Sequence, residues 1–467
     1  MAESEHVVLF PFIAQGHIIP FLKLAKLLVS QGLTVSFLTT TKNASKLQSQ
    51  ALGSHIRFIP LSLPHIDGLP HGCDTADSLT LLENMLLLSS AHKLSAPFEE
   101  WLQQVTSDPS QKPLCIISDV FLGWTADSAS RFGIPRVVFH TTGAMGASIL
   151  QYLFTNPLSE LISGDGGTVK IRDLSLVLNL SHSAVVEIFG NNSDSPDLLR
   201  MLETFRHNYG TAKRSCAATL VNTLDGVDAE YVRYLEETSG KPAWPIALPL
   251  RNPQKGVQNE SECIRWLDTQ EQNSVLFVSF GSQLFLSEGQ IKALARGIEA
   301  SEQPFIWSIK DPVGSNINSC EFLPEGFVEA TKDRGMVVHG WVPQQAILFH
   351  PSTACFMSHC GWNSTLESVC AGVSMVVWPM IFDQFINAKL VVEQLRIGLQ
   401  ICEGWDKIPN SYIIEKTIKA AMIEEMGKEM HERAGKIKES IEDMSWNSNV
   451  ETFVSYIVSL RSHQILN

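Results

Sequence analysis

The sequence predicts an α/β protein made of two doubly wound parallel sheets. Short, nearly all-apolar segments alternate with segments of helical periodicity, a pattern typical of parallel strands that helices cover on both faces. The alternation stops at a proline-rich stretch and then begins again, which indicates two domains of similar architecture. The length of 467 residues agrees, because one ordinary hydrophobic core does not grow that large.

Apolar runs of strand length mark the sheet of the first domain. The first run, HVVLFPF, passes through a turn into a helix that ends at Gly32. The polar, turn-rich stretch 156–200 reads as an insertion. The predicted strands are 6–12, 33–40, 55–61, 113–120, 136–142 and 218–223, and the helical stretches between them are 18–32, 41–50, 79–105, 124–132 and 143–155.

The second domain repeats the alternation with different residues. Its predicted strands are 274–280, 304–310, 335–341, 353–359 and 373–379, and its helices include 286–301, 364–372 and the charged segment 422–444. The resulting division is an N-terminal domain at 1–240, a linker at 241–260, a C-terminal domain at 261–440, and a C-terminal helix at 441–467 that is a candidate to pack back across the domain junction.

Composition excludes several classes of function. A net charge of -14 disfavours nucleic acid and anionic membrane surfaces, which both attract positive charge. The start of the chain does not resemble a signal peptide, and no apolar run reaches the roughly 18 residues of a membrane helix. The nine Cys form no C-x-x-C pair or Cys/His cluster, and there is no D-x-D pair, so we expect reduced thiols, a cytoplasmic protein and no bound metal.

Polar chemistry gathers in one segment, 341–384. Its strand TACFMSH leads through a tight turn at Gly361 into a helix. The unpaired backbone N–H groups and the positive end of a helix make such a point a natural phosphate site. The side chains of His359, Asn363 and Ser364 can add hydrogen-bond donors there.

Each of these residues also has an ordinary structural explanation. Ser364 and Glu367 match the S-x-x-E capping box, which needs no ligand. A lone His359 is more often a satisfied structural histidine, and a lone Trp341 is more often part of a core. The set points to a ligand only because all of its members follow strands that end at the same edge of the sheet.

The segment resembles the nucleotide-sugar signature of plant UDP-dependent glycosyltransferases, the family 1 enzymes of plant secondary metabolism. The frame W-x-P-Q, H-P, H-C-G-W-N-S-x-x-E, G-V, W-P and D-Q is present over the full span of that signature. Val342 stands where Ala is usual, and Ser374 stands where Pro is usual. The resemblance implies the GT-B fold, in which two Rossmann-like doubly wound domains face each other.

The resemblance also implies roles for the donor site. Trp341 would stack on uracil, a contact worth about 1–3 kcal/mol per base in nucleic-acid complexes. Glu367 would accept both ribose hydroxyls, which suits a carboxylate with two oxygens. The other implied contacts are the Val342 backbone and Gln344 with base and ribose, His359, Asn363 and Ser364 with the diphosphate beside the Gly361 turn, and Trp362, Asp383 and Gln384 with the sugar. The terminal Asp-Gln pair is similar to that of the glucose-using members.

A second pair of residues lies in the first domain. His17 follows the first strand, and Asp119 follows the strand PLCIIS. Taken alone, His17 is more often a helix-terminal residue and Asp119 a helix cap. In the family that the chain resembles, the matching histidine is the general base that takes a proton from the acceptor hydroxyl, and the matching aspartate orients it.

Two weaker matches complete the candidate site. Ser282, in Phe280-Gly281-Ser282, looks like the second phosphate loop of the family, and Thr141 resembles a contact to the sugar. Either residue is equally compatible with an ordinary turn or strand end.

The resemblance therefore implies an inverting UDP-glucosyltransferase that acts on a small lipophilic acceptor such as a phenolic, flavonoid or terpenoid. UDP-glucose would be the donor substrate, with no other cofactor and no metal, and we expect a monomer without nucleic-acid or integral membrane partners. The alternatives are a nucleotide-sugar enzyme of another reaction type on the same fold and a non-catalytic nucleotide-sugar-binding protein.

Overall fold

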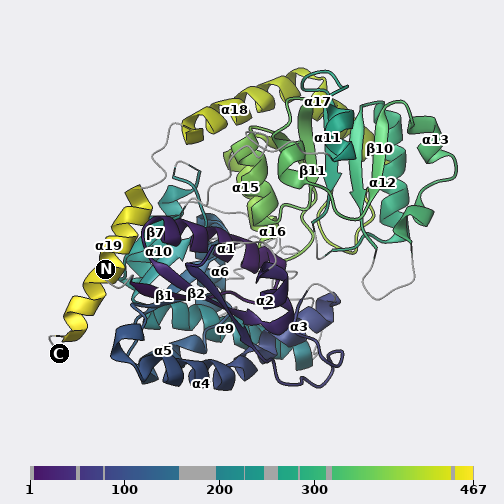
Figure 1. Cartoon of the computed structure of the whole chain (residues 1–467). Coiled ribbons are helices and arrows are strands. Elements are labelled where there is room, and N and C mark those ends of the chain that lie inside the picture. The colour runs from purple at the N-terminus through teal and green to yellow at the C-terminus, as the bar shows by residue number, and fades with distance from the viewer. Residues whose placement is uncertain are drawn as a thin grey trace. The chain divides into compact units, whose positions relative to one another are not determined.

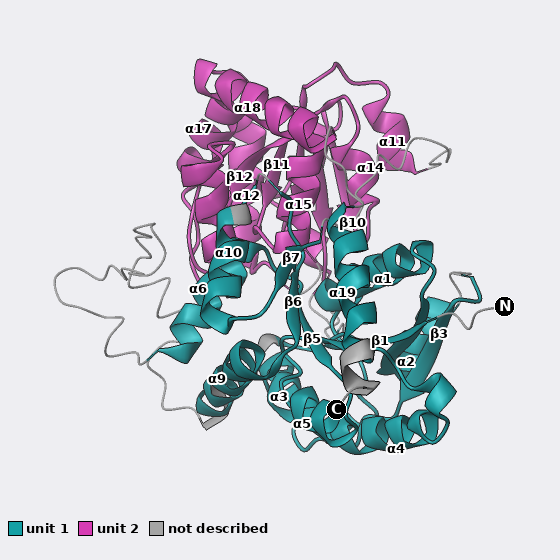
Figure 2. Ribbon diagram, turned by 90° about the vertical axis from the view of Figure 1, so that its left-hand side faces the viewer, with its two compact units in different colours: residues 1–182, 189–249, 445–467 teal, residues 183–188, 250–444 magenta. Residues whose placement is uncertain are grey.

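The computed structural model describes residues 5–48, 53–76, 79–156, 196–225, 227–246, 261–281, 284–311, 318–442 and 448–465. The chain divides into two compact units, coloured separately in Figure 2. Unit 1 holds the described residues up to 246 together with those from 448 onward. Unit 2 holds the described residues between 261 and 442.

Unit 1 contains a seven-stranded parallel sheet in the order β3-β2-β1-β4-β5-β6-β7. The two central neighbours, β1 and β4, are in register with Val8 opposite Ile116 and Phe10 opposite Ser118. The strands are β1 His6–Phe10, β2 Thr34–Thr40, β3 Ile56–Leu61, β4 Ile116–Asp119, β5 Arg136–His140, β6 Ala218–Val221 and β7 Ala243–Pro245.

Helices connect and cover these strands (Figure 1). They are α1 Gln15–Ser30, α2 Thr41–Gln48, α3 Leu81–Ser90, α4 Ser95–Thr106, α5 Thr125–Arg131, α6 Ala144–Thr155, α9 Pro196–Ser215, α10 Ala229–Ser239 and α19 Ser448–Ile465, with 3₁₀ turns η1 Ala91–Leu94 and η2 Pro109–Gln111. The helical stretch predicted at 79–105 is confirmed. It is divided into α3, η1 and α4, since Pro97 lacks the N–H group that a continuous helix would use there.

The C-terminal helix α19 belongs to the core of unit 1. Its Val450, Phe453 and Ile457 lie in the same apolar cluster as Val7 and Phe21. The ring of Phe453 also meets Trp244 edge to face at 5.6 Å, and the Tyr456 hydroxyl donates to the Ala217 carbonyl at 2.8 Å. The last segment of the chain therefore completes the first unit, while its predicted packing across the domain junction stays a prediction.

Unit 2 contains a six-stranded parallel sheet in the order β10-β9-β8-β11-β12-β13. Its strands are β8 Val275–Ser279, β9 Phe305–Ile309, β10 Gly335–His339, β11 Thr353–Ser358, β12 Ser374–Val377 and β13 Gly398–Gln400. Its helices are α11 Glu262–Leu267, α12 Glu288–Ser301, α13 Phe327–Thr331, α14 Gln344–Leu348, α15 Trp362–Ala371, α16 Gln384–Lys389, α17 Ser411–Met422 and α18 Glu425–Glu442, with the 3₁₀ turn η3 Ser319–Phe322 and the π-helical turn η4 Leu390–Gln394.

The two parallel sheets with flanking helices confirm the predicted fold class. Because all strands of each sheet run in one direction, their carboxyl ends share one edge, where ligands bind in folds of this kind. The predicted insertion 156–200 falls mostly outside the described residues, as does most of the linker. Among the described helices, none is both long and apolar enough to cross a membrane.

Phe453→Ala is expected to lower the free energy of unfolding of unit 1 by about 3–5 kcal/mol, because it removes a fully buried aromatic ring and leaves a cavity. Val458→Ala on the same helix is the matched control, since Val458 is 38% exposed, and its cost should stay below about 0.5 kcal/mol. Chemical denaturation of both variants measures the difference. Equal stability of the two variants would contradict the place of α19 in the core.

Candidate active site

The first cluster of polar side chains lies at the carboxyl edge of the sheet in unit 1. Helix α1 begins two residues before His17, and Asp119 is the last residue of β4. Since β1 and β4 are neighbours in the sheet, the turn after β1 lies next to Asp119. The His17 Nδ1 atom is 2.7 Å from Asp119 Oδ2, so the structure brings these two predicted residues into direct contact.

The carboxylate of Asp119 has no exposed surface and is held by the backbone. Its Oδ1 accepts the N–H of Phe121 at 2.9 Å, and its Oδ2 accepts the N–H of Phe12 at 3.3 Å. Hydrogen bonds of this kind compensate a buried carboxylate for its lost hydration. A carboxylate can only accept, so His17 Nδ1 carries the proton that is shared with Asp119, and the lone pair of neutral His17 is on Nε2.

Aromatic rings surround the imidazole. The ring of Phe12 lies 5.4 Å from that of His17, edge to face, and the ring of Phe121 lies 4.8 Å away. Thr141, just after β5, brings its Oγ1 to 3.1 Å from His17 Nδ1. The structure thus places Thr141 beside the histidine, whereas its predicted contact with the sugar stays a prediction.

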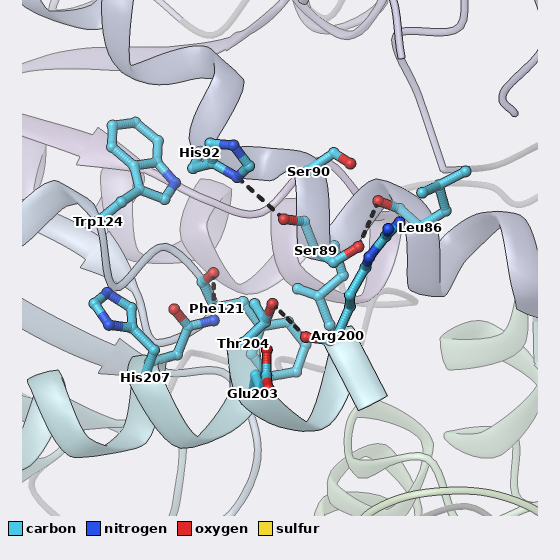
Figure 3. Close-up of a pocket in the computed structure, with 12 residues that line it drawn as sticks. Leu86, Ser89, Ser90, His92, Phe121, Trp124, Arg200, Glu203, Thr204 and His207 are labelled. Carbon is cyan, nitrogen blue, oxygen red and sulfur yellow. Dashed lines mark hydrogen bonds between the residues drawn. The ribbon is translucent and has the colours of Figure 1, made fainter. Parts of the chain in front are cut away.

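Phe121 also lines a pocket of about 570 Å³ in unit 1, drawn in Figure 3. The walls come from α3, from the loop after β4 and from α9, whose Arg200, Glu203 and His207 add polar groups. Apolar surface comes from Leu86, Leu88, Phe121 and Trp124. Most of the residues that line the pocket are polar or charged, but its accessible surface is more apolar than polar, a mixture that suits a small organic ligand.

One side chain of α9 fixes the loop that carries Phe121. The Asn208 Nδ2 donates to the Phe121 carbonyl at 2.8 Å, and its Oδ1 accepts the Gly123 N–H at 3.1 Å. A Cβ atom at Gly123 would lie 2.5 Å from Asn208 Oδ1, so the loop approaches α9 as closely as glycine permits. Asn208 therefore ties the pocket wall to the loop that holds Asp119.

The second cluster lies at the carboxyl edge of the sheet in unit 2. After β11 the chain passes through His359, Cys360 with φ of 62°, and Gly361 before α15 begins at Trp362. The imidazole of His359 lies against two glycines, because a Cβ at Gly281 or Gly361 would lie 2.6 Å from it. Gly281 also has a φ of +78°, which other residues rarely adopt.

His359 is a neutral hydrogen-bonding group in this environment. Burial, together with the smaller effect of the nearby positive charge of Lys310, lowers its pKa from 6.5 to about 4. Imidazole at this position therefore serves at neutral pH as a donor or acceptor without a charge.

The capping-box alternative for Ser364 and Glu367 is wrong. The N-cap of α15 is Gly361, which has no side chain, so Ser364 lies inside the helix. Its Oγ instead accepts the Gln344 amide at 3.1 Å. The Glu367 carboxylate accepts Gln344 Nε2 at 2.7 Å through Oε2 and Gln345 Nε2 at 2.8 Å through Oε1.

Trp341 is not a core residue either. Its side chain is 80% exposed, whereas the neighbouring Val342 is buried. Gly340, with φ of 96°, turns the chain just after β10 so that the indole is presented at the surface. A large exposed aromatic side chain beside polar groups is a ready stacking surface.

The remaining donor-site candidates surround the starts of α15 and α16. Trp362 is buried at the first position of α15, and Asn363 follows it. The Asp383 carboxylate accepts Asn387 Nδ2 at 3.1 Å, and the same amide donates to the Cys360 carbonyl at 2.9 Å. Gln384 uses its Oε1 to accept the N–H groups of Met380 and Ile381.

Ser282 lies outside the described residues, so its predicted role stays a prediction. Among the residues that the structure describes, no group of three or more His, Cys, Asp or Glu side chains could hold a metal ion.

Comparisons with known proteins decide the family. The family model "UDP-glucoronosyl and UDP-glucosyl transferase" matches residues 252–400. Scopoletin glucosyltransferase of Nicotiana tabacum is 34% identical over 93% of this chain and 93% of its own, and anthocyanin 3'-O-beta-glucosyltransferase of Gentiana triflora is 31% identical over the same shares. This chain belongs to the plant UDP-glycosyltransferases. It is a UDP-dependent glycosyltransferase of that family.

Solved structures of plant UDP-glycosyltransferases support the same family assignment. A UDP-glucosyltransferase from Polygonum tinctorium capable of glucosylating indoxyl has a TM-score of 0.82 and 27% identity, covering 98% of this chain and 99% of its own. The Phytolacca americana UGT2 complexed with UDP-2fluoro-glucose and pterostilbene has a TM-score of 0.80 and 27% identity, covering 97% and 100%.

Four residues near the glycosyltransferase site were not among the predictions. Gln345 shares Glu367 with Gln344, Asn387 holds Asp383, Asn208 holds the Phe121 loop, and Lys310 lies near His359. Gln345 stands beside a predicted residue, so the W-x-P-Q-Q run contained a signal for it. Asn208 and Lys310 act across distances in the chain that no local pattern reveals, whereas Asn387 stands one helical turn after Asp383.

His359 is expected to stay neutral down to about pH 4, where an exposed histidine would titrate near 6.5. Because the folded pKa is lowered, the unfolded chain binds a proton below pH 6.5 that the folded chain does not, and acid destabilises unit 2 through this residue. NMR titration of the imidazole C–H signals, with His359→Asn to assign the resonance, measures the midpoint. A midpoint near 6.5 would contradict the environment described.

Proposed function

We propose that this protein is an inverting glucosyltransferase that moves glucose from UDP-glucose to a hydroxyl of a small lipophilic acceptor. The observation that carries the proposal is the 2.7 Å contact of His17 with the buried Asp119, at the carboxyl edge of a doubly wound sheet. It places a general base beside a buried carboxylate of fixed orientation, in a family whose members transfer sugars.

In the proposed reaction His17 is the general base. With Nδ1–H held by Asp119, Nε2 has the lone pair that takes the proton of the acceptor hydroxyl as its oxygen attacks the anomeric carbon. The imidazolium that forms is stabilised by the Asp119 carboxylate. Attack on the face opposite UDP converts the α-linked glucose of the donor into a β-glucoside.

Unit 2 would bind the donor. Exposed Trp341 offers its face to uracil, and Glu367, already oriented by two amides, has lone pairs left for the ribose hydroxyls. The start of α15, with neutral His359 beside it, would receive the diphosphate without a metal ion. Asp383 and Gln384 would bind the sugar and favour glucose.

The acceptor is proposed to be a phenolic, flavonoid or terpenoid. The pocket in unit 1 offers apolar and aromatic surface between polar side chains and reaches Phe121, whose ring also contacts His17. Relatives are named for scopoletin and anthocyanin, which are phenolic compounds. A cytoplasmic location, a monomeric state and transfer to oxygen complete the proposal.

His17→Ala and Asp119→Asn are each expected to lower kcat for glucose transfer by about 10²–10⁴-fold, through loss of the base and loss of its correct tautomer respectively. UDP affinity should stay unchanged, because neither residue belongs to the donor site in unit 2. His55→Ala, an exposed histidine of the same unit, is the matched control. Near-normal transfer by His17→Ala would refute the mechanism.

The reaction itself is tested by product analysis. Hydroxylated plant metabolites are incubated with UDP-glucose, UDP-galactose or UDP-xylose, and products are detected by mass and their anomeric configuration by NMR. A β-glucoside formed with release of UDP supports the proposal. Release of UDP without an acceptor would favour another nucleotide-sugar reaction, and binding of UDP-glucose without any turnover would favour a non-catalytic protein.

Asn208→Asp is expected to raise the acceptor KM by about tenfold, because a carboxylate cannot donate to the Phe121 carbonyl and repels it. UDP affinity, measured by calorimetry, should not change. Arg206→Gln, an exposed substitution on the same helix, is the control. Equal acceptor KM values for the two variants would show that the pocket wall does not depend on Asn208.

A further inference from the structure

Lys310 is a half-buried cation at the carboxyl edge of unit 2. It follows β9 directly, and its Nζ donates to the carbonyl of Gly281, just beyond β8, at 2.9 Å. Burial lowers the pKa of its ammonium group. In the part of the chain that the structure describes, no carboxylate lies within ion-pair distance of Lys310.

This lysine differs from others in the same unit. Lys292, Lys332, Lys389 and Lys419 each pair with a glutamate three or four residues away in the chain. The next residue, Asp311, is an unsuitable partner because it is engaged by His339 at 2.6 Å and by the Ser319 N–H at 2.7 Å. A cation partly removed from water and left without a counterion indicates a place for an anion.

The surroundings of Lys310 locate that place. Strands β9, β8 and β11 are adjacent in the sheet, so the residues that follow them lie side by side. His359, which follows β11, lies against Gly281, and the charge of Lys310 is close enough to lower the pKa of His359. Three residues further on, α15 begins, and the positive end of its helix dipole lies at the same edge.

We propose that Lys310 binds the diphosphate of the UDP-sugar and neutralises charge on the UDP that leaves. The inference rests on the proposed function, since it assumes that the start of α15 receives this diphosphate. With Lys310 the donor site gains a full positive charge, whereas neutral His359 and the helix end supply only partial ones.

The role of Lys310 in the reaction follows from the negative charge that develops on UDP as it leaves. As the acceptor oxygen forms its bond to the anomeric carbon, the bond from that carbon to the β-phosphate oxygen breaks and its electron pair stays on UDP. The acceptor proton goes to His17 Nε2. Lys310 is already protonated, so it transfers nothing and stabilises the added negative charge on UDP electrostatically.

Lys310→Met tests the proposal, with affinities for UDP and uridine measured by calorimetry. The variant is expected to bind UDP about 10- to 100-fold more weakly and uridine as well as the wild type does, because only UDP has the diphosphate. Lys310→Arg should recover most of the UDP affinity. Lys332→Met, which removes an exposed lysine of the same unit, is the control and should change neither affinity.

Two results would overturn the proposal. Unchanged UDP affinity in Lys310→Met would show that the charge does not reach the diphosphate. An equal loss of UDP and uridine affinity would show that Lys310 only holds the Gly281 loop through its hydrogen bond. If the wild type bound UDP and transferred glucose in either case, the proposed function would stand; a wild type that bound no UDP would overturn both.

A second measurement needs no variant. Amine acylation of the wild-type protein is followed by mass spectrometry in the presence of UDP or uridine. UDP should protect Lys310 from acylation and uridine should not, while Lys332 reacts equally in both. Equal labelling of Lys310 with the two ligands would overturn the proposal even if Lys310→Met failed to fold.

Discussion

A parallel sheet covered on both faces leaves only its ends for polar chemistry, and both sites of this protein depend on that constraint. The central strands of the two sheets are mostly apolar and buried, so a charged side chain within them would lose its hydration unless other groups compensated it. Past the carboxyl end of a strand, the backbone N–H groups of loops and helix starts become available. Asp119, His359 and Asp383 all lie at such points.

The environment of Asp119 shows how the fold stabilises a buried charge. Two backbone N–H groups and one imidazole satisfy the carboxylate, and all three come from the segments that follow β1 and β4, which the sheet brings together. Removing such a partner leaves the buried charge uncompensated and typically lowers the free energy of unfolding by several kcal/mol. The same groups that stabilise the charge also fix His17 in one tautomer, so stability and the proposed base function have one cause.

Other buried polar groups support the loops of unit 1. Asp228, whose pKa burial raises to about 6, accepts the Met145 N–H at the start of α6, close to Thr141. Arg136 donates through Nε to Ser118 and Thr125 on either side of the Asp119 loop. Asp228 links the start of α6 to the loop before α10, and Arg136 links β5 to β4 and α5, which restricts how far the residues around His17 can move.

The fold class and the family could be predicted from the sequence because both depend on patterns that are local in the chain. Strand–helix alternation is a local pattern, and the 341–384 segment supplies its residues from one continuous stretch of chain that is ordered by a single sheet edge. The capping and core explanations for Ser364 and Trp341 could be excluded only from the structure. Burial, the N-cap of α15 and the partner of each side chain depend on three-dimensional packing.

Each residue that escaped prediction has a partner that is distant in the chain, although Asn387 also holds Asp383, four residues earlier. Asn208 meets a loop 85 residues earlier, and Lys310 meets Gly281 29 residues earlier. Nothing in the neighbouring sequence of either residue distinguishes it from a surface amide or a surface lysine.

The proposed acceptor pocket is also assembled from segments that are distant in the chain, namely α3, the loop after β4 and α9. Its selectivity is therefore a property of packing between separate helices. Changes on α3, or on α9 at positions other than Asn208, can therefore reshape the pocket while the backbone donors that hold Asp119, and with them the base, stay in place.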